Sequence, residues 1–205
     1  FNASGQFGDG TSSSKITPTQ ESTRATNWSA IAAGAYHTVA LRSDGTLWAW
    51  GSNSLGQLGD GTNSNKITPT QESTGAITWS AIATGRYHTV ALRSNGTLWA
   101  WGNNHLGQLG DGTNTSKTTP TQESTRATNW SAIIASDNHT VALRSDGTLW
   151  AWGDNSSSQL GTAQAWHAVP MQTGTGTDWT AAFTLASGDI KGMVAFTIDF
   201  ISDTA

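Results

Sequence analysis

The sequence predicts an all-β fold, a β-propeller built from about four 51-residue repeats. First, residues 51–101 recur almost verbatim as residues 102–152. Second, runs of strand-forming residues alternate with tight turns in each copy, and the 205 residues include 23 Gly, 11 Trp and only 4 Pro. Third, no stretch has the length or the period of a helix. Repeated units of about 50 residues holding up to four short strands are typical of propellers.

The repeat divides the chain into units that together form one propeller domain or segment, residues 1–205. His37, His88 and His139 fall at the same place in successive copies. The fourth unit opens in register and keeps Trp179, then diverges and loses the His-Thr-Val-Ala-Leu string. The units are residues 1–50, 51–101, 102–152 and a divergent 153–205.

Each unit contains a predicted strand and a predicted hairpin. In the first copy, residues 28–33 read as a short strand that Gly34 ends, and residues 37–41 and 47–50 read as the two arms of the hairpin. Two-residue hairpin turns require positive φ at both central residues, which Asp-Gly and Asn-Gly supply. The turn dipeptides are Asp44-Gly45, Asn95-Gly96 and Asp146-Gly147.

A glycine-rich loop and a polar run follow each hairpin. Residues 56–61 form the loop in the second unit, and the polar run continues to Pro69 and Glu72. Residues 59–63 and 110–114 have the acidic and glycine content of calcium loops, but they lack the alternation of ligands and the closing Glu. We therefore expect turns here and no metal site.

The composition excludes several classes of protein. Ten Lys and Arg against 14 Asp and Glu leave a net charge of −4, so nucleic acid is not an expected partner. With no Cys there is no disulfide framework or thiolate chemistry. No apolar stretch reaches the length of a membrane span. The sequence also lacks a nucleophile elbow, a zinc-protease motif and a phosphate loop, so we expect no enzyme activity, no catalytic residues and no cofactor.

The hairpin and the loop together resemble the repeat of the regulator of chromosome condensation family. The resemblance is carried by residues 88–92 (His-Thr-Val-Ala-Leu), 95–102 (Asn-Gly-Thr-Leu-Trp-Ala-Trp-Gly) and 104–110 (Asn-His-Leu-Gly-Gln-Leu-Gly). It implies a propeller, usually of seven blades, in which each sequence repeat contributes strands to two neighbouring blades. The family includes a nucleotide exchange factor on chromatin, a plant ultraviolet-B photoreceptor and a secreted bacterial inhibitor of β-lactamase, so the fold alone selects no function.

The residues discriminate among these functions. The acidic balance disfavours chromatin binding. The photoreceptor's Gly-Trp-Arg-His-Thr signature is missing, because the corresponding residues 34–37 (Gly-Ala-Tyr-His), 85–88 (Gly-Arg-Tyr-His) and 136–139 (Ser-Asp-Asn-His) have no tryptophan before the histidine. We therefore predict a non-enzymatic module of a secreted or surface-exposed bacterial protein, extracellular, which binds a protein partner or self-associates. The alternative is a lectin-like propeller that binds carbohydrate.

Some of the differences between the copies fall in the two residues before each histidine; another set is Ser54 against His105, and Arg24 against Gly75 and Arg126. If the pairs before the histidines lie in loops on one face of the ring, they form a contact surface, because Tyr and Arg dominate interface energetics. The competing interpretation is drift at tolerant exposed positions. The candidate binding residues are Tyr36, Arg86, Tyr87, Asp137 and Asn138.

The other conspicuous residues are interpreted as structural. We expect each repeated histidine to be hydrogen-bonded to the backbone of its own or the next blade. The Trp-Ala-Trp pairs, such as Trp99 and Trp101, are expected to be largely buried between blades, although they could instead form sugar-stacking platforms.

The sequence leaves open how the propeller ring is closed. An isolated arc would expose apolar blade faces, so the chain is part of a larger ring, closes by oligomerising, or makes a compact four-bladed ring. The divergent tail, residues 180–205, is predicted to pair with the first unit or with a second chain through the strand-like residues 193–196 and 198–201.

Overall fold

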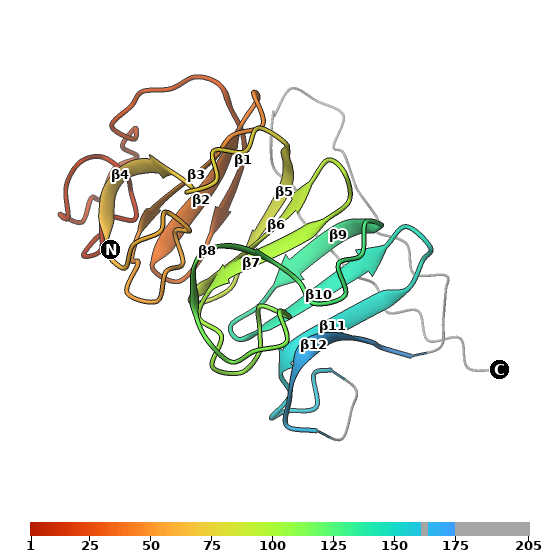
Figure 1. Cartoon of the computed structure of the whole chain (residues 1–205). Helices are drawn as coiled ribbons and strands as arrows, with labels where there is room; N and C mark the ends of the chain where they lie inside the picture. The colour runs from red at the N-terminus through yellow and green to blue at the C-terminus, as the bar shows by residue number, and fades with distance from the viewer. Residues whose placement is uncertain (161–163, 175–205) are drawn as a thin grey trace.

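The computed structural model describes residues 1–160 and 164–174, which form twelve strands in three antiparallel sheets (Figure 1). Each sheet is one blade of a propeller, and consecutive strands in it are neighbours. Blade 1 contains β1 (Trp28–Ala33), β2 (His37–Arg42), β3 (Leu47–Gly51) and β4 (Lys66–Gln71); blade 2 contains β5 (Trp79–Thr84), β6 (His88–Arg93), β7 (Leu98–Gly102) and β8 (Lys117–Gln122); blade 3 contains β9 (Trp130–Ala135), β10 (His139–Arg144), β11 (Leu149–Asp154) and β12 (Trp166–Gln172).

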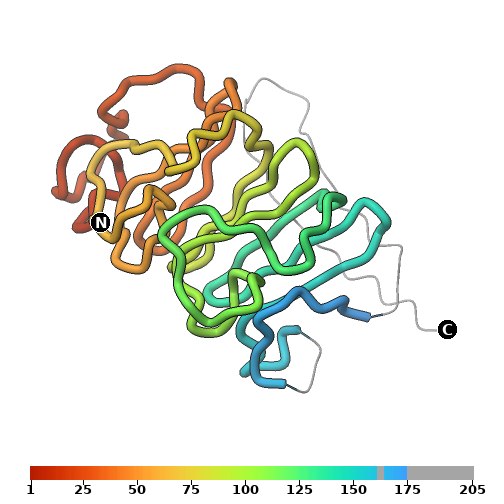
Figure 2. Tube along the Cα trace, viewed as in Figure 1, coloured from red at the N-terminus to blue at the C-terminus, as the bar shows by residue number. Residues whose placement is uncertain are grey.

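The three blades lie side by side, and the chain passes through them in order (Figure 2). β1 lies against β5, and β5 lies against β9, so the first strands of the blades converge. The 51-residue unit predicted for residues 51–101 supplies β4 to blade 1 and β5 to β7 to blade 2. The division of each repeat between two blades, which the family resemblance implies, is therefore present.

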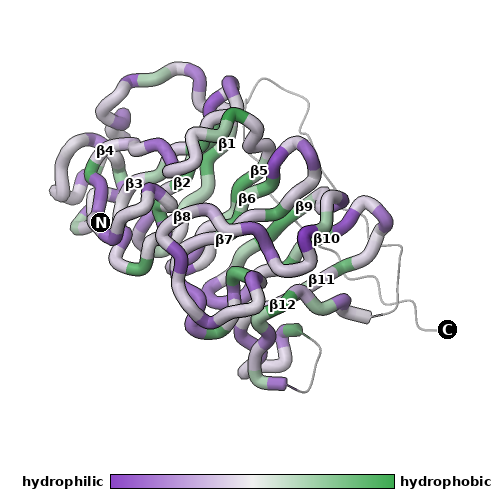
Figure 3. The backbone as a smooth tube through the Cα atoms, viewed as in Figure 1, coloured by the Kyte–Doolittle hydropathy of each residue, from purple (hydrophilic) through white to green (hydrophobic). Residues whose placement is uncertain are grey.

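The core lies between the blades. Hydrophobic residues are concentrated on the strands, and the connecting loops are mostly polar (Figure 3). One cluster joins blade 1 to blade 2, and its members are Val39, Leu41, Leu47, Ala49, Leu58, Trp79, Ala91 and Trp101. The equivalent cluster joins blade 2 to blade 3, and it contains Val90, Leu92, Leu98, Ala100, Leu109, Trp130, Ile133, Ala142 and Trp152. Each blade therefore buries apolar side chains on both faces when it has neighbours on both sides.

The hairpins form where they were predicted, but their turns are of another class. Gly45 has φ 79°, whereas Asp44 does not have positive φ. The Gly45 N–H donates to the Arg42 carbonyl, and the Arg42 N–H donates to the Thr46 carbonyl. This is a type I turn followed by a glycine bulge, and it needs only one residue at positive φ. The prediction that both central residues have positive φ was wrong. The Asp44 side chain accepts hydrogen bonds from Thr46 and stabilises the longer turn.

The fourth strand of each blade lies in the polar run that follows the glycine-rich loop, where no strand was predicted from the sequence. β4 pairs with β3, with Gln71 opposite Trp48 and Thr70 opposite Ala49. Residues 15–20 have the same sequence as β4, Lys-Ile-Thr-Pro-Thr-Gln, yet they are not a strand. No described strand pairs with them, so strand formation in this hexapeptide is decided by the neighbouring edge.

One position before the first strand of each blade has a left-handed backbone in all three copies. It holds Arg24 (φ 53°), Gly75 (φ 63°) and Arg126 (φ 54°). Glycine adopts this conformation without the steric cost that other residues bear. The Gly at this position in the second copy is therefore explained by backbone geometry.

Replacing Arg126 with Gly should raise the free energy of unfolding by about 1 kcal/mol, because the strain of a left-handed non-glycine residue disappears. Arg126 is exposed, so little packing is lost. Denaturant unfolding of the variant measures the change. The reciprocal substitution, Gly75→Arg, should lower the stability by a similar amount, and a gain there would contradict the explanation.

The predicted pairing of residues 180–205 lies outside the described residues. Within the part of the chain that the structure describes, no helix has the length and hydropathy needed to cross a membrane.

Candidate functional site

The five candidate residues lie in three equivalent loops of successive blades. Tyr36 lies between β1 and β2, Arg86 and Tyr87 lie between β5 and β6, and Asp137 and Asn138 lie between β9 and β10. Arg86 and Asp137 are exposed, and the other three side chains are half-buried. We call these five residues the loop face.

Direct contacts join the loops. The rings of Tyr36 and Tyr87 stack with centroids 5.8 Å apart and an angle of 19° between their planes. Phe1 meets Tyr36 edge-on, with centroids 6.5 Å apart. The Arg86 guanidinium lies 5.5 Å from the centre of the Tyr87 ring, and the Arg86 N–H donates to the Asp137 carbonyl at 3.1 Å. The loop face is therefore a continuous surface across three blades.

The charge of Arg86 is held in place by its neighbours. Hydrogen bonding to Tyr87 raises the pKa of Arg86, and the Tyr36 side chain and the Asp137 carboxylate add to the effect. The guanidinium is thus a fixed positive charge beside an exposed carboxylate. Such a mixed surface, with two aromatic rings at its centre, suits a protein partner better than a partner of uniform charge.

A hollow of about 360 Å³ lies beside the loop face, where β1, β5 and β9 end. Its walls are mostly small residues, and Arg86 and Asp137 are the charged residues among them. The lining residues are Ala33, Gly34, Ala35, Thr84, Gly85, Arg86, Ala135, Ser136 and Asp137.

The histidines that follow the loop face link one blade to the next. The His37 Nε2 lies 3.1 Å from the Oγ1 of Thr89 in blade 2, and that hydroxyl donates to the Gln57 carbonyl at 2.8 Å. His88 makes the same contact with Thr140 of blade 3, at 3.2 Å. The hydroxyl has one proton and gives it to the carbonyl, so Nε2 must donate. The histidines are structural as predicted, but their partner is a threonine side chain and not the backbone.

Burial keeps these two imidazoles neutral. Desolvation lowers the pKa of His37 from 6.5 to about 4, and the pKa of His88 to about 3, where His37 and His139 also contribute. The Nδ1 atoms of both rings are buried without a hydrogen-bond partner. A proton on either ring would therefore be a buried, unpaired charge.

Acid should weaken the link between blades. An unfolded histidine takes up a proton below about pH 6.5, whereas the folded rings stay neutral to about pH 4 and about pH 3, so stability is present above pH 6.5 and is lost as the pH falls. Between pH 7.5 and 5.5 we expect a loss of about 1 kcal/mol for each ring. Denaturant unfolding at the two pH values measures it.

The matched variant is His88→Asn. It should be less stable at pH 7.5 and should lose the part of the pH dependence that His88 contributes, about 1 kcal/mol between pH 7.5 and 5.5. A pH dependence as large as that of the unchanged protein would contradict the assignment to these rings.

The loops with a calcium-like composition are turns. The Asp60 carboxylate accepts hydrogen bonds from Thr62 and from the Asn53 amide, and its second oxygen lies 3.2 Å from Lys66 Nζ. Asp111 has the same partners in the next copy, with Lys117 at 3.3 Å. These contacts are those of a self-contained turn. Among the described residues, no three His, Cys, Asp or Glu side chains are grouped to hold a metal ion.

The Trp-Ala-Trp pairs of the second and third blades pack between blades. Trp101 is fully buried and Trp50 is 4% exposed, as expected for packing residues. Trp99 is only half-buried, and the Arg93 guanidinium lies 4.2 Å from its ring centre. In the second blade, water therefore does not reach the Trp101 ring, and the Arg93 guanidinium lies over the Trp99 ring. The Trp-Ala-Trp pairs therefore do not offer two open rings side by side for a sugar, and carbohydrate binding stays an untested alternative.

Two buried polar residues that hold the loops were missed. The fully buried Asn53 amide donates to Asp60 and to the Thr62 carbonyl, and Glu72 accepts from the Trp79 indole at 3.2 Å. Both recur at the repeat interval, as Asn104 and Glu123. Identity between the copies was the signal that could have identified them.

Sequence models of the Regulator of chromosome condensation (RCC1) repeat match the chain in two forms. One form matches residues 28–57, 79–108 and 131–159. The other matches residues 44–92 and 95–143. Together the matches run from β1 through β11.

Relatives and solved structures agree with these matches. The chain is 34% identical over 163 residues to the ultraviolet-B receptor UVR8 of Arabidopsis thaliana, covering 78% of this chain and 37% of the receptor. It is 34% identical over 175 residues to the probable E3 ubiquitin-protein ligase HERC4 of Homo sapiens, covering 78% of this chain and 17% of the ligase. The chain thus spans well under half the length of these relatives.

The fold is similar to that of two solved proteins. Prp20p of Saccharomyces cerevisiae superposes with a TM-score of 0.64 at 22% identity, over 70% of this chain and 37% of Prp20p. Human WBSCR16 superposes with a TM-score of 0.65 at 23% identity, over 72% of this chain and 40% of that protein. The likeness concerns the fold, because the identity is low.

Proposed function

Because this chain belongs to the RCC1 repeat family, whose members are typically protein-interaction or regulatory modules, we propose that it is a non-catalytic protein-binding module that uses its loop face. One observation carries the proposal. The pairs of residues before the histidines, which differ between the copies, come together from three blades as one aromatic and charged surface.

The scaffold beneath that surface supports a binding role. The Tyr36 carbonyl accepts a hydrogen bond from Ser52 at 2.8 Å, and the Tyr87 carbonyl accepts one from Asn103 at 2.9 Å. The loops are therefore anchored while their side chains vary. Preorganised aromatic side chains lose little conformational entropy on binding, which favours affinity.

The relatives support the general class of function and not a particular partner. The structure of Prp20p is described together with its binding to Gsp1p and histones. Prp20p is otherwise too distant, at 22% identity, to transfer a partner. HERC4 is named as a ligase, but this chain covers 17% of it, so ligase activity is not part of the proposal.

We also propose an extracellular or cell-surface location, as expected for a secreted bacterial module. The cysteine-free composition, rich in Ser and Thr, is compatible with it. Fractionation of cells that produce the protein, followed by detection in the medium and in the cell-surface fraction, tests the location. Detection confined to the interior of the cell would contradict it.

A random peptide library displayed on phage tests the binding function. The full chain is the bait, and a double variant, Arg86→Ser with Tyr87→Ser, is the counter-selection bait. Peptides that bind the unchanged chain should bind the double variant about tenfold more weakly or worse, because truncating two interface anchors costs more than about 1.4 kcal/mol.

The control is Arg126→Ser, which removes an exposed arginine at the opposite end of a blade and should leave peptide binding unchanged. If no peptide were enriched, or if the selected peptides bound the double variant equally well, the proposal that the loop face binds a protein would be wrong. A glycan array probed with the same baits tests the carbohydrate alternative. Glycan binding that the double variant loses, without peptide binding, would replace the protein partner with a sugar.

A further inference from the structure

The hairpin turn of blade 2 differs chemically from its two equivalents. The position that holds Asp44 in blade 1 and Asp146 in blade 3 holds Asn95 in blade 2. Asn95 is exposed and precedes Gly96, and no other asparagine in the sequence precedes a glycine. The backbone nitrogen that follows an asparagine can attack its side-chain amide, and glycine has no side chain to hinder that attack. This pair is therefore a candidate for self-modification.

The Asn95 amide is held by the residue two positions further on. The Thr97 N–H donates to Asn95 Oδ1 at 3.2 Å, and the Thr97 hydroxyl donates to the same oxygen at 2.7 Å. Thr97 is only 7% exposed, and its hydroxyl accepts a hydrogen bond from the Trp99 indole at 2.9 Å, so both donors are fixed in place. Two donors on one carbonyl oxygen stabilise the negative charge that develops there when a nucleophile adds to the carbon.

The same turn accommodates an aspartate. Asp44 accepts hydrogen bonds from the Thr46 N–H at 3.0 Å and from the Thr46 hydroxyl at 2.6 Å, and Asp146 makes the same two contacts in blade 3. These threonine donors lower the pKa of both aspartates. The turn therefore favours a carboxylate, and an aspartate at position 95 would need no rearrangement.

We propose that Asn95 is a modification site, at which attack by the Gly96 backbone nitrogen converts the side-chain amide to the carboxylate of a normally linked aspartate. The nitrogen loses its proton to solvent base and bonds to Asn95 Cγ. The Cγ–Nδ2 bond then breaks, and the amide nitrogen takes up a proton and leaves as ammonia, so that a cyclic succinimide remains. Water adds to Cγ, the bond from Cγ to the Gly96 nitrogen breaks, and that nitrogen regains its proton. The net change is hydrolysis of an amide to a carboxylate and ammonia, and it consumes only water.

The threonine donors select between the two ways in which the ring can open. Attack of water at Cγ restores the normal backbone, whereas attack at the backbone carbonyl carbon of residue 95 gives isoaspartate, in which the chain runs through the side chain. The donors of Thr97 point at Oδ1, the oxygen on Cγ, and therefore favour the first route.

Packing against blade 3 also disfavours isoaspartate. The Gly96 carbonyl accepts a hydrogen bond from the Trp130 N–H at 3.0 Å, and a Cβ atom on Gly96 would lie 2.2 Å from the Thr128 carbonyl oxygen. Isoaspartate adds one atom to the backbone before Gly96, which would push the turn out of this close contact. The normally linked product leaves the contact intact.

One hydrogen bond must open before the ring can close. The Gly96 N–H donates to the Arg93 carbonyl at 2.9 Å, and the nitrogen can attack only after it leaves that oxygen. Exposed turns open locally at a small cost in free energy. The bond therefore slows the conversion in the folded chain without preventing it.

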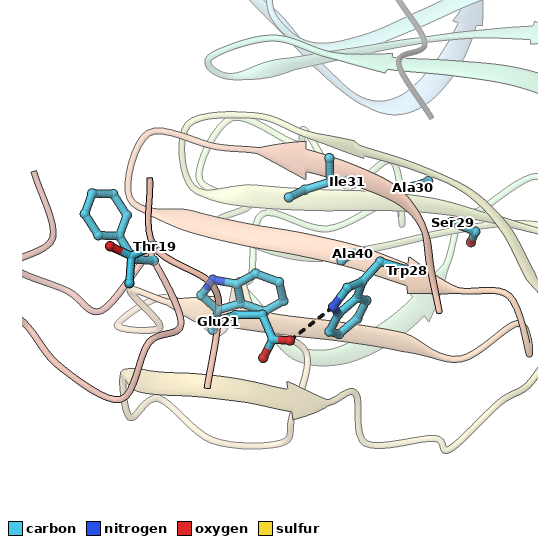
Figure 4. A pocket seen from close by; sticks show the side chains of 9 residues that line it. Thr19, Glu21, Trp28, Ser29, Ala30, Ile31 and Ala40 are labelled. Carbon is cyan, nitrogen blue, oxygen red and sulfur yellow. Dashed lines mark hydrogen bonds between the residues drawn. The ribbon is translucent and has the colours of Figure 1, made fainter. Parts of the chain in front are cut away.

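The site is separate from the surfaces described above. Asn95 lies between β6 and β7, whereas the loop face lies between the first and second strands of each blade. Neither the hollow beside the loop face nor the cavity of about 310 Å³ that Trp28, Ile31 and Trp50 line on blade 1 (Figure 4) includes Asn95. The conversion adds one negative charge to a chain of net charge −4, and the proposal does not depend on the function of the loop face.

Incubation of the folded full chain at mildly alkaline pH, followed by peptide mapping with tandem mass spectrometry, tests the proposal. The peptide with residue 95 should acquire the mass of the acid, and electron-transfer fragmentation should identify most of the product as normally linked aspartate. The exposed Asn63 and Asn114, which precede serine and threonine, should convert far more slowly. The proposal is wrong if Asn95 stays an amide in the folded chain while it converts in the urea-unfolded chain, or if isoaspartate is the main product.

Two threonine variants test the role of the hydroxyl. Thr97→Val removes that donor at nearly the same volume, so the conversion should slow about tenfold and the share of isoaspartate should rise. Thr97→Ser keeps the hydroxyl and should behave as the unchanged chain. Equal rates and equal products in all three proteins would contradict the assignment to Thr97.

The Asn95→Asp variant tests the product directly and does not depend on how the threonine variants fold. It should elute with the aged protein in anion exchange and should unfold at a denaturant concentration at least as high as that of the unchanged chain. A clear loss of stability in this variant would show that the turn does not accommodate the product, against the proposal.

Discussion

Replacing Gly96 with valine should lower the free energy of unfolding by at least about 3 kcal/mol. Gly96 has φ 75°, and a Cβ atom there would lie 2.2 Å from the Thr128 carbonyl oxygen. The Gly96 carbonyl also accepts a hydrogen bond from the Trp130 N–H at the start of β9. The substitution therefore strains the hairpin and pushes the turn away from the next blade. Chemical denaturation of the purified variant measures the loss.

Gly75→Val separates the two causes of this loss. Gly75 has a similar φ of 63°, but no atom lies within 4 Å of the Cβ position. This variant should therefore lose only the cost of backbone strain, about 1 to 2 kcal/mol. If the two variants were equally destabilised, the contact between the Gly96 turn and the next blade would have no energetic importance.

Trp101→Ala should destabilise the protein by about 3 to 5 kcal/mol. The Trp101 ring is fully buried, lies 5.8 Å from Trp79, and contacts the Gly59 backbone. Its indole donates to the Gln57 carbonyl at 3.1 Å, so truncation removes packing and leaves that carbonyl with fewer donors. Thermal and denaturant unfolding measure the effect.

Trp101→Phe is the control for the hydrogen bond, because it keeps most of the apolar volume. It should lose clearly less than the alanine variant. Emission from Trp101 should be blue-shifted and poorly quenched by iodide, as for a ring that water does not reach. Red-shifted, readily quenched emission assigned to this residue would show that the blade interface is not closed.

Strands and hairpins could be predicted because they are local. The runs around Val39 and Leu47 have strand-forming side chains, and Gly45 marks the turn between them. β4 could not be predicted, since the same hexapeptide is a strand at residues 66–71 and not at residues 15–20. Only the edge of β3 distinguishes the two, and that edge is a property of the assembled blade.

The candidate site, too, could be predicted from the sequence only in part. The variable pairs before the histidines were visible in the sequence, and their placement in equivalent loops followed from the repeat. The stacking of Tyr36 on Tyr87 and the position of Arg86 beside both depend on the angle between blades. The hydrogen-bond partner of His37 could not be predicted either, because Thr89 lies 52 residues away in the sequence and belongs to another sheet. Whether the loop face binds a partner stays a prediction.

The bond from each histidine to the threonine of the next blade has a consequence for how opening spreads along the chain. Blade 2 receives such a bond through Thr89 and makes one through His88, so of the described blades it alone is tied on both sides. In stacked units, local opening costs the sum of the neighbouring interfaces. Amide hydrogens of β6 and β7 should therefore exchange with deuterium more slowly than those of β2 and β10, and fraying should begin at the outer blades.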